Sequence, residues 1–275
     1  MSSSLAIAAA FFYGFADFAG GYATRRLSVW TVIAWAQLLG LGLLAVGVVV
    51  VPASVVTRAD LLWGAGAGLA GLIGLVLLYL ALARGSMTIA APISGAVAAV
   101  IPVLVDVIAG TGLTTRQWFG VGLALGAILL VGLEHSRGRL DRRSLLYAVV
   151  AGALFGVFFV AFSQTDPASG LWPLVTARAI SVPIAFAMAA SRGVVAPPRS
   201  ELLGIVAVAG NLDMAANIAG ALALQRGPAG VTAVLVSLYP AVTAGMAMLV
   251  LRERPTRLQL LGVGLALGAV IALVG

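Results

Sequence analysis

Long apolar runs separated by short polar connections make up the whole chain. A helix that crosses a membrane needs about 20 mostly apolar residues. Ten runs meet this requirement, at residues 4–25, 29–51, 60–83, 87–110, 115–134, 144–165, 170–191, 201–225, 229–251 and 257–275. The connections are rich in Arg, Pro and Ser and leave no room for a soluble domain. This pattern predicts an all-α polytopic membrane protein with ten transmembrane helices.

An octapeptide that occurs twice divides the chain into two related halves. Gly-Val-Gly-Leu-Ala-Leu-Gly-Ala covers residues 120–127 and returns at 262–269, 142 residues later. Other pairs share that offset, among them Tyr13-Gly14 and Phe155-Gly156. Several matches in one register indicate a duplication. We therefore predict a five-helix repeat at residues 1–134, a polar linker at 135–143 and a second five-helix repeat at 144–275.

The odd number of spans in each half determines how the halves are oriented. After five crossings, the second half enters the membrane from the opposite side, so the two repeats are inverted. Inverted repeats are the architecture of many secondary transporters, whose sites lie near the midplane where the halves meet.

The composition supports this class and argues against several others. The chain is 62% apolar, only 9% charged, and has a mean hydropathy of +1.13, which is incompatible with an ordinary soluble domain. The net charge of +7 comes from Arg in the connections, so it is no nucleic-acid signal. Without Cys there is no thiol chemistry, and the single histidine, His135, has no metal-binding neighbours in sequence. We expect no metal, no cofactor and no enzymatic activity.

The distribution of Arg predicts the orientation in the membrane. Twelve Arg lie in the connections after odd-numbered spans and three in those after even-numbered spans. Because cytoplasmic loops carry more Arg, the loop at 134–144 is expected in the cytoplasm and both termini outside. The predicted location is the inner membrane of a bacterial cell.

Glycines in the spans are expected to serve helix packing. Gly66, Gly68 and Gly71 match the string GxGxxG, but no strand precedes them, so the dinucleotide-binding interpretation is rejected. Small residues let helices approach closely in lipid. This role is assigned to the following glycines: Gly64, Gly68, Gly71, Gly122, Gly126, Gly264 and Gly268. The spans carrying the octapeptide are expected to pack as a pseudo-symmetric pair.

Four ionisable residues lie within spans, where they are costly and are candidates for function: Asp17, Asp106, Arg178 and Asp213. Tyr13 shares a helical face with Asp17, and Asn217 shares one with Asp213. Neither Asp17 nor Asp213 has a basic residue within one helical turn. We expect at least one of these two to bind a cationic or amine-bearing substrate or to carry protons.

The other two ionisable residues have alternative interpretations. Asp106 lies near the end of its span, where contact with headgroups or a loop is as good an explanation as function. For Arg178 a structural role is favoured, either as the partner of an Asp or with its guanidinium at the membrane surface.

Prolines predict interruptions in one span of each half. Pro92 and Pro102 lie in the fourth span, and Tyr239 and Pro240 follow Ser237-Leu238 in the ninth. Paired interruptions in corresponding helices are a pointer to a transport site. Tyr239 suits either packing or ligand contact.

The end of the second half carries the most specific motif. Ser237-Leu-Tyr-Pro240, Leu251-Arg-Glu-Arg-Pro-Thr256 and Gln259-Leu-Leu-Gly262 resemble the signature of the drug/metabolite transporter superfamily, specifically its EamA-type exporters. The resemblance covers nearly the whole chain. The first half departs from it, with Thr111-Gly112 in place of the Glu-Arg pair and no Arg in its second helix.

The resemblance implies a central cavity lined by helices 1, 3, 4, 6, 8 and 9, and export of small metabolites, often amino acids, or drugs. Ser94 and Gln164 become candidates for the cavity on these grounds. Members of the family often have cytoplasmic termini, which disagrees with the Arg count; we keep the orientation that the count predicts.

Three functional classes remain open at this stage. The leading hypothesis is a secondary transporter that works by alternating access without ATP, with a small-molecule substrate and protons as candidate partners in the lipid bilayer, as a monomer or weak homodimer. A flippase for lipid-linked substrates shares the fold. An intramembrane enzyme with two Asp is the remaining alternative, although the sequence context of such enzymes is missing.

Overall fold

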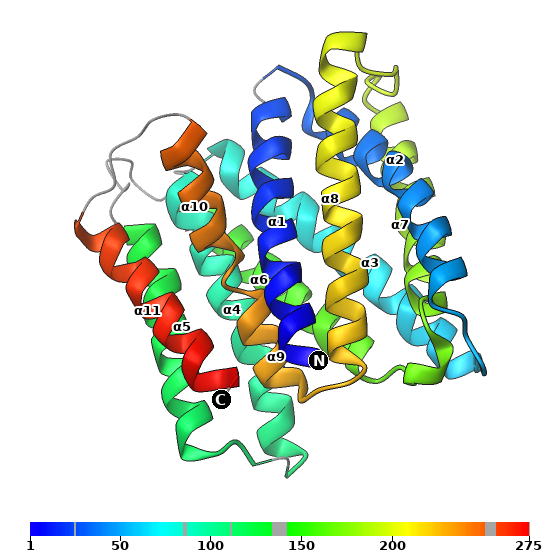
Figure 1. Cartoon of the computed structure of the whole chain (residues 1–275). Helices are drawn as coiled ribbons and strands as arrows, with labels where there is room; N and C mark the ends of the chain where they lie inside the picture. Colours follow the sequence, from blue (N-terminus) through cyan, green and yellow to red (C-terminus); the bar gives the residue numbers. More distant parts are fainter. Residues whose placement is uncertain (25, 85–86, 111, 134–141, 251–256, 275) are drawn as a thin grey trace.

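The structure is a computed structural model that describes residues 1–24, 26–84, 87–110, 112–133, 142–250 and 257–274. These residues form helices and connections (Figure 1). The helices are α1 Ser2–Thr24, α2 Val29–Val50, α3 Arg58–Arg84, α4 Met87–Ile108, α5 Thr115–Leu133, α6 Arg142–Ser163, η1 Pro167–Ser169, α7 Trp172–Ala190, α8 Ser200–Leu224, α9 Ala229–Val236, α10 Tyr239–Val250 and α11 Arg257–Val274.

The helices account for the ten predicted spans. Six of them (α1, α2, α3, α6, α7 and α8) are each long and apolar enough to cross a membrane. Four shorter apolar segments supply the others, namely α4, α5, α11 and the pair formed by α9 and α10. The all-helical ten-span fold class is therefore confirmed.

The ninth span is broken as predicted, but the fourth is not. α9 ends at Val236, and α10 begins at Tyr239 with Pro240 in its first turn, where a missing N–H is harmless. α4 runs unbroken through Pro92 and Pro102. The expectation of an interruption in each half is therefore wrong for the first half, since packed neighbouring helices can compensate for the lost backbone bonds.

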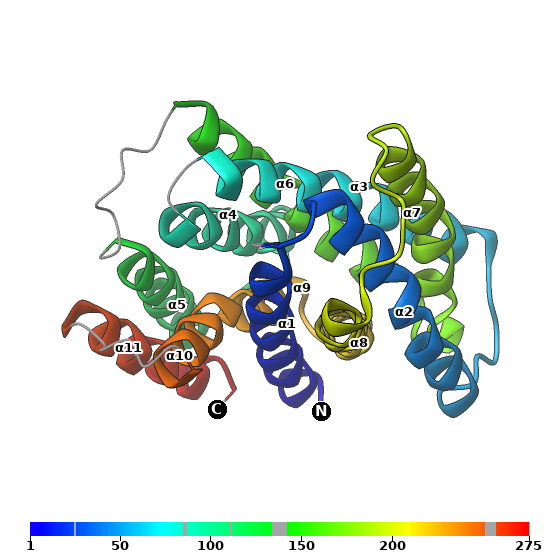
Figure 2. The same ribbon diagram turned by 90° about the horizontal axis from the view of Figure 1, so that it is seen from above.

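The two halves interleave around the centre of the bundle. Seen from above, α4, α6, α3 and α7 follow one side, and α1, α8 and α2 follow the other (Figure 2). α5, α10 and α11 lie together beyond α4 and α1. α1 packs mainly on α8, and α6 on α3 and α4, so each half contributes helices to both sides.

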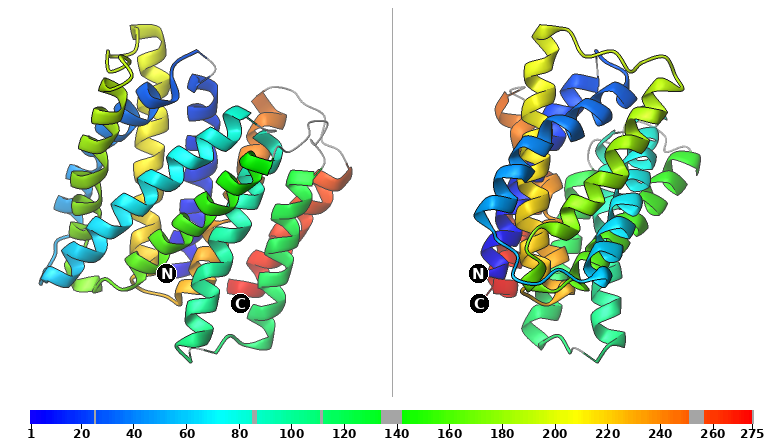
Figure 3. Two further views of the ribbon diagram at one scale, coloured as in Figure 1. Left: turned by 180° about the vertical axis from the view of Figure 1, so that it is seen from behind. Right: turned by 90° about the vertical axis from the view of Figure 1, so that its right-hand side faces the viewer.

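The inverted repeat is visible in the positions of the chain ends. Both termini lie at one end of the bundle, whereas α5 finishes and α6 begins at the opposite end (Figures 1 and 3). We call these the terminus end and the linker end. The right-hand view of Figure 3 shows α7 and α8 diverging toward the linker end.

Equivalent glycines make equivalent helix crossings between the halves. A Cβ atom added at Gly68 of α3 would overlap the backbone of Ala177 in α7. Its counterpart in the repeat, Gly210 of α8, has the same relation to the backbone of Ala36 in α2. The packing role predicted for Gly68 is therefore confirmed, and the third helix of each half lies directly against the second helix of the other.

The octapeptide helices α5 and α11 pack against each other, as predicted, but only two of the four predicted glycines lie at the contact. A Cβ added at Gly126 or Gly268 would lie 3.7 Å or 3.4 Å from a leucine of the facing helix, so the packing role predicted for these two is confirmed. A Cβ at Gly122 or Gly264 would meet no atom within 4 Å, so the role predicted for these two is wrong. The close contact is at Gly120, whose added Cβ would come within 2.8 Å of Leu273. The helices face each other at this position, and Gly122 and Gly264 turn outward.

Replacing Gly68 with alanine is expected to destabilise the protein. The added methyl group overlaps backbone, which cannot move aside as a flexible side chain can. Overpacking of this kind costs about 1–3 kcal/mol. The apparent melting temperature of the purified protein in detergent should fall by several degrees.

Gly66→Ala is the matched control for that change. Gly66 lies on the same helix two residues earlier, is exposed, and has no atom within 4 Å of its added Cβ. Its melting temperature should equal or exceed that of the parent chain, because alanine favours helix. Equal melting temperatures for the two variants would contradict the close crossing of α3 and α7.

Candidate functional site

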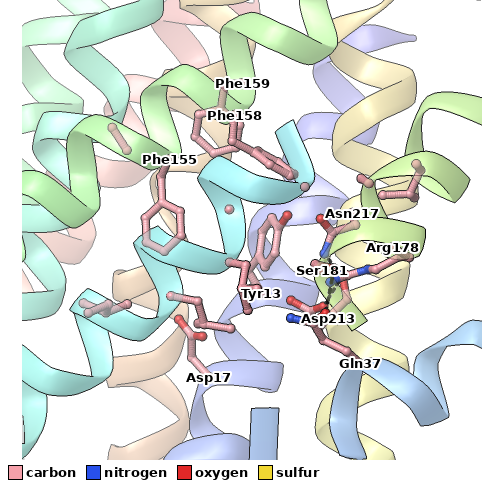
Figure 4. A pocket seen from close by; sticks show the side chains of 18 of the residues that line it. Tyr13, Asp17, Gln37, Phe155, Phe158, Phe159, Arg178, Ser181, Asp213 and Asn217 are labelled. Carbon is pink, nitrogen blue, oxygen red and sulfur yellow. Dashed lines mark hydrogen bonds and ion pairs between the residues drawn. The ribbon is translucent and has the colours of Figure 1, made fainter. Parts of the chain in front are cut away.

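A cavity lies between the two halves at the middle of the bundle (Figure 4). Its empty volume is about 840 Å³, part of which is open to the surroundings, and this size suits a small organic molecule. Side chains from α1, α2, α3, α4, α6, α7, α8 and α10 line it. The polar lining residues are Tyr13, Asp17, Gln37, Arg178, Ser181, Asp213, Asn217 and Tyr239.

An ion pair joins α7 to α8 on the polar side of the cavity. Arg178 Nη2 donates to Asp213 Oδ2 over 2.6 Å. The Arg178 side chain is 10% exposed, and that of Asp213 is 36% exposed, toward the cavity. Asn217, one helical turn further along α8, donates its side-chain amide to the backbone carbonyl of Asp213 over 2.7 Å. The ion pair between Arg178 and Asp213 fixes the orientation of both charged groups.

A second polar contact joins the two halves beside the ion pair. Ser181 Oγ of α7 donates to Gln37 Oε1 of α2 over 2.7 Å, and both residues are buried. Ser181 lies one helical turn from Arg178, so the ion pair and this hydrogen bond form one polar wall. Arg178 Nη2, Ser181 Oγ and the Asn217 amide each donate within the wall, whereas Arg178 Nε has no partner in the described structure.

Asp17 lies apart from this wall and has no such partner. Within the described part of the chain, no hydrogen bond or ion pair reaches its carboxylate. The charge that acts on it most is the like charge of Asp213. When Asp17 is ionised, the two carboxylates and one guanidinium give the described lining one net negative charge, centred on Asp17.

An aromatic wall faces the polar one. Phe155, Phe158 and Phe159 of α6 line the cavity, and the ring centroids of Phe158 and Phe159 are 5.7 Å apart. Two glycines of α3 hold these rings in place. A Cβ added at Gly71 would come within 3.0 Å of the Phe158 ring, and one at Gly74 would come equally close to that of Phe155.

Tyr13 completes the aromatic lining from α1. Its ring packs against that of Tyr239 with centroids 6.1 Å apart, next to the break between α9 and α10. Thr243 strengthens this junction by donating to the Gly14 carbonyl over 3.2 Å and to the Tyr239 carbonyl over 3.1 Å. The broken span thus places Tyr239 at the cavity.

Hydrogen bonds join the two sides of the bundle at its terminus end. Gln225, at the end of α8, donates to Thr165 Oγ1 and to the Gly170 carbonyl, each over 3.0 Å. On the other flank, the Gly230 N–H at the start of α9 donates to Asp106 Oδ2 of α4 over 2.6 Å. We call these contacts the terminus-end closure.

The structure brings six of the sequence candidates to the cavity: Tyr13, Asp17, Arg178, Asp213, Asn217 and Tyr239. Arg178 was expected to have an Asp partner as one alternative, and Asp213 is that partner. Helical spacing does not indicate this pair, because the two residues lie 35 positions apart on different helices.

Other candidates lie elsewhere. Gln164 is exposed beyond the end of α6, where its side-chain amide reaches Ser163 Oγ at 3.4 Å and no other described residue, so its placement at the cavity is wrong. Ser94 is fully buried in α4 and does not line the cavity, nor do Pro92, Pro102 and Pro240. Asp106 caps the start of α9, which agrees with the loop-contact interpretation. The Leu251–Thr256 motif and His135 lie outside the described residues.

Gln37, Ser181 and the aromatic wall line the cavity but were not predicted from the sequence. Gln37 could have been found, because a glutamine in the middle of an apolar span is itself unusual. Ser181 follows Arg178 by three residues and shares its face. The phenylalanines carried no such signal, since apolar rings in a membrane helix are ordinary. Among the described residues, no group of three potential metal ligands occurs.

Comparison with known proteins identifies the family. The model of the EamA-like transporter family matches residues 1–133 and again residues 142–275, which together are nearly the whole chain. The chain belongs to the EamA-like transporter family. It is therefore a multi-pass membrane protein of the drug/metabolite transporter superfamily, and its two halves each match the family repeat.

A solved structure titled "Crystal structure of protein" shares the fold of this EamA-like chain. The two superpose with a TM-score of 0.72 over 98% of this chain and 95% of the other, at 17% sequence identity. Identity this low shows the fold alone. No curated protein matches the sequence.

Proposed function

We propose that this EamA-like protein is a secondary transporter that exports small amine-bearing metabolites or drugs by alternating access of the central cavity. The observation that carries the proposal is the unpartnered carboxylate of Asp17 in a cavity between inverted halves. A buried carboxylate is costly in a membrane unless a cation or a proton neutralises it. A bound ammonium group supplies that charge.

The arrangement of the halves supports alternating access. The cavity lies between them, and the terminus-end closure holds one end shut with hydrogen bonds that can break and re-form. With the orientation that the Arg distribution predicts, the linker end faces the cytoplasm and the termini lie outside. A substrate would then enter from the cytoplasm and leave past Gln225 and Asp106.

The ion pair argues against an aspartyl-type enzyme. Such a site needs two carboxylates that share a proton. Asp213 is instead held by Arg178, so Asp17 and Asp213 have different environments. The polar wall also favours a soluble substrate over a lipid-linked one, because the latter needs a wide apolar groove.

Efflux from cells that overproduce the protein tests the proposal. Cells are loaded with a panel of amino acids, amines and cationic dyes, and retention and growth resistance are compared with cells carrying an empty vector. At least one amine-bearing compound should be retained less. Asp17→Asn should abolish the difference, whereas Phe119→Leu, an exposed aromatic position on α5, should not.

Two outcomes would overturn the proposal. Full activity of Asp17→Asn at every pH tested would remove the carboxylate from the mechanism. Indifference to the whole panel, with the protein folded and in the membrane, would favour a lipid-linked substrate.

A further inference from the structure

We infer that Asp60 is a positioning residue for the terminus end of the bundle. It holds the connection between α6 and α7 where Gln225 of α8 can bond to it, and so favours the state in which this end is closed. Asp60 does not line the cavity. The inference concerns which end of the cavity opens, and it rests on the alternating access proposed above.

One oxygen of the Asp60 carboxylate caps its own helix. Asp60 lies in the first turn of α3 and is only 3% exposed. Its Oδ2 accepts from the backbone N–H of Thr57 over 2.9 Å and from Thr57 Oγ1 over 2.6 Å. The Asp60 N–H donates in return to Thr57 Oγ1 over 3.2 Å, which completes a reciprocal cap at the start of the helix. Oδ1 is left for a different partner.

That second oxygen reaches into the other half of the chain. Asp60 Oδ1 accepts from the backbone N–H of Asp166 over 2.8 Å, although 106 positions separate the two residues. Asp166 begins η1, because its own carboxylate accepts from the N–H of Ala168 over 2.7 Å. Its carbonyl accepts from Ser169 Oγ over 2.7 Å. Hydrogen bonds to an ionised group are stronger than those between neutral groups, so Asp60 anchors η1 firmly at its first residue.

The connection between α2 and α3 supports η1 from a second side. The N–H groups of Ser54 and Val55 both donate to the Ala168 carbonyl, over 2.9 Å and 3.3 Å. Gly170 follows η1 with a φ of +55°, and a Cβ added there would come within 3.0 Å of the Val51 carbonyl oxygen. Both connections lie at the terminus end (Figure 1). η1 belongs to the second half, but it is held in place by the first.

Gln225 bonds to the two ends of this anchored segment. Its Nε2 donates to Thr165 Oγ1 and to the Gly170 carbonyl, each over 3.0 Å. Thr165 directly precedes Asp166, and Gly170 directly follows η1. All three bonded residues are buried. One amide nitrogen reaches both acceptors only while η1 keeps them at this separation, so loss of the Asp60 carboxylate should also weaken both Gln225 bonds.

The sequence does not repeat this arrangement in the other half. At the offset of 142 residues, Leu202 stands at the position of Asp60, and Ala83 stands at that of Gln225. Neither side chain can form a hydrogen bond. Two identical inverted repeats would give the two access states equal free energies by symmetry, so bonds present at one end alone shift the equilibrium. Asp60 and Gln225 therefore favour the state that is closed at the terminus end.

Thiol labelling from each face of the membrane tests the inference. The chain has no cysteine, and Leu174 is 1% exposed and lines the cavity, so Leu174→Cys provides a single reporter. The full-length protein, in right-side-out and in inverted vesicles, is treated with a membrane-impermeant maleimide. Asp60→Leu, which copies the residue of the other half, should accelerate labelling about tenfold from the face of the terminus end. The rate from the linker face should not change.

A double-mutant cycle shows whether Asp60 acts through Gln225. Gln225→Leu alone should give a similar acceleration. Asp60→Leu/Gln225→Leu should then also give about tenfold, in place of the roughly hundredfold expected of two independent changes. Asp60→Ala is the second variant if Asp60→Leu does not give a monodisperse protein.

Glu201→Leu is the matched control. Glu201 is also an acidic residue in the first turn of a third helix, but it is exposed and lies at the linker end, on α8. Its replacement removes the same charge without touching η1. Labelling from the face of the terminus end should therefore stay at the rate of the parent chain.

The outcomes separate the inference from the proposed function. Equal acceleration from both faces would show a general loosening of the fold and would overturn the positioning role. Multiplicative effects in the double variant would overturn the action through Gln225. Unchanged labelling in Asp60→Leu, with efflux from cells intact, would overturn the inference and leave the transporter proposal standing. One-sided acceleration without efflux of any compound in the panel would support the positioning role and count against the proposed function.

Discussion

Asp213→Asn is expected to destabilise the protein more than any other single change at the cavity. It leaves the Arg178 guanidinium, which is only 10% exposed, without a counter-charge in the middle of the bundle. Breaking one partner of a buried pair costs about 3–5 kcal/mol. The partial exposure of Asp213 puts the expected cost near the lower limit, at about 3 kcal/mol. The melting temperature in detergent should fall by several degrees, and yield should fall with it.

Removing both charges should restore the stability. In Arg178→Met/Asp213→Asn, the long apolar side chain of methionine fills the space of the arginine stem, and no charge is left unpaired. The double variant also removes Arg178 Nε, which is buried without a partner in the described structure. Asp17→Asn should not be destabilised, because that carboxylate has no partner to lose. A melting temperature of Asp213→Asn equal to that of wild type would contradict the role of the ion pair.

Gln225→Leu is expected to open the terminus end of the cavity more often. The leucine is similar in size but donates neither of the two hydrogen bonds to Thr165 and Gly170. Each lost bond weakens the closed state by about 1 kcal/mol, so the open population should rise by about tenfold or more. The chain has no cysteine, so Leu171→Cys, at a position 1% exposed beside this closure, introduces a single thiol. Its labelling by a membrane-impermeant maleimide should accelerate by the same factor.

Gln164→Leu provides the control for that measurement. Gln164 lies in the same connection after α6, but it is exposed, and among the described residues its side chain bonds only to Ser163, so labelling should not change. The sidedness of labelling reports the orientation as well. Labelling from outside intact cells is expected; labelling only in inverted vesicles would overturn the placement of the termini outside. An unchanged rate in Gln225→Leu would show that these bonds do not limit opening.

The fold followed from sequence because its determinants are local. Apolar runs of membrane length fix the spans, and an odd number of them in each repeat fixes the inversion. The break at Ser237-Leu238 was also readable, because Pro240 cannot continue a helix from the preceding turn. The same rule failed for Pro92 and Pro102, where the outcome depends on how neighbouring helices satisfy the freed carbonyls, and sequence does not show this.

The candidate site was predictable only in part, for a related reason. Ionisable groups at membrane depth stand out in any sequence, and so Asp17, Arg178 and Asp213 were found. Which of them pair with one another depends on how α7 and α8 cross. The periodicity of residues along a single helix does not predict this crossing. Gln164 was wrongly placed at the cavity because the resemblance to the family indicates which helices line the cavity but not which face of each helix does so.

Gly71 and Gly74, which lie against the rings of the aromatic wall, limit how the two halves could diverge in sequence after the duplication. Gly71 occupies the position in the first half that Asp213 occupies in the second, and Phe158 rests against it within 3.0 Å of an added Cβ. A protein with two identical halves, each bearing this Asp and this Phe, would place the carboxylate side chain inside the ring. An Asp side chain at position 71 of α3 and the ring of Phe158 on α6 therefore cannot both be present where these two helices cross. The residue at position 71 and the residue at position 158 are therefore coupled, and a change to a larger side chain at either one requires a small side chain at the other.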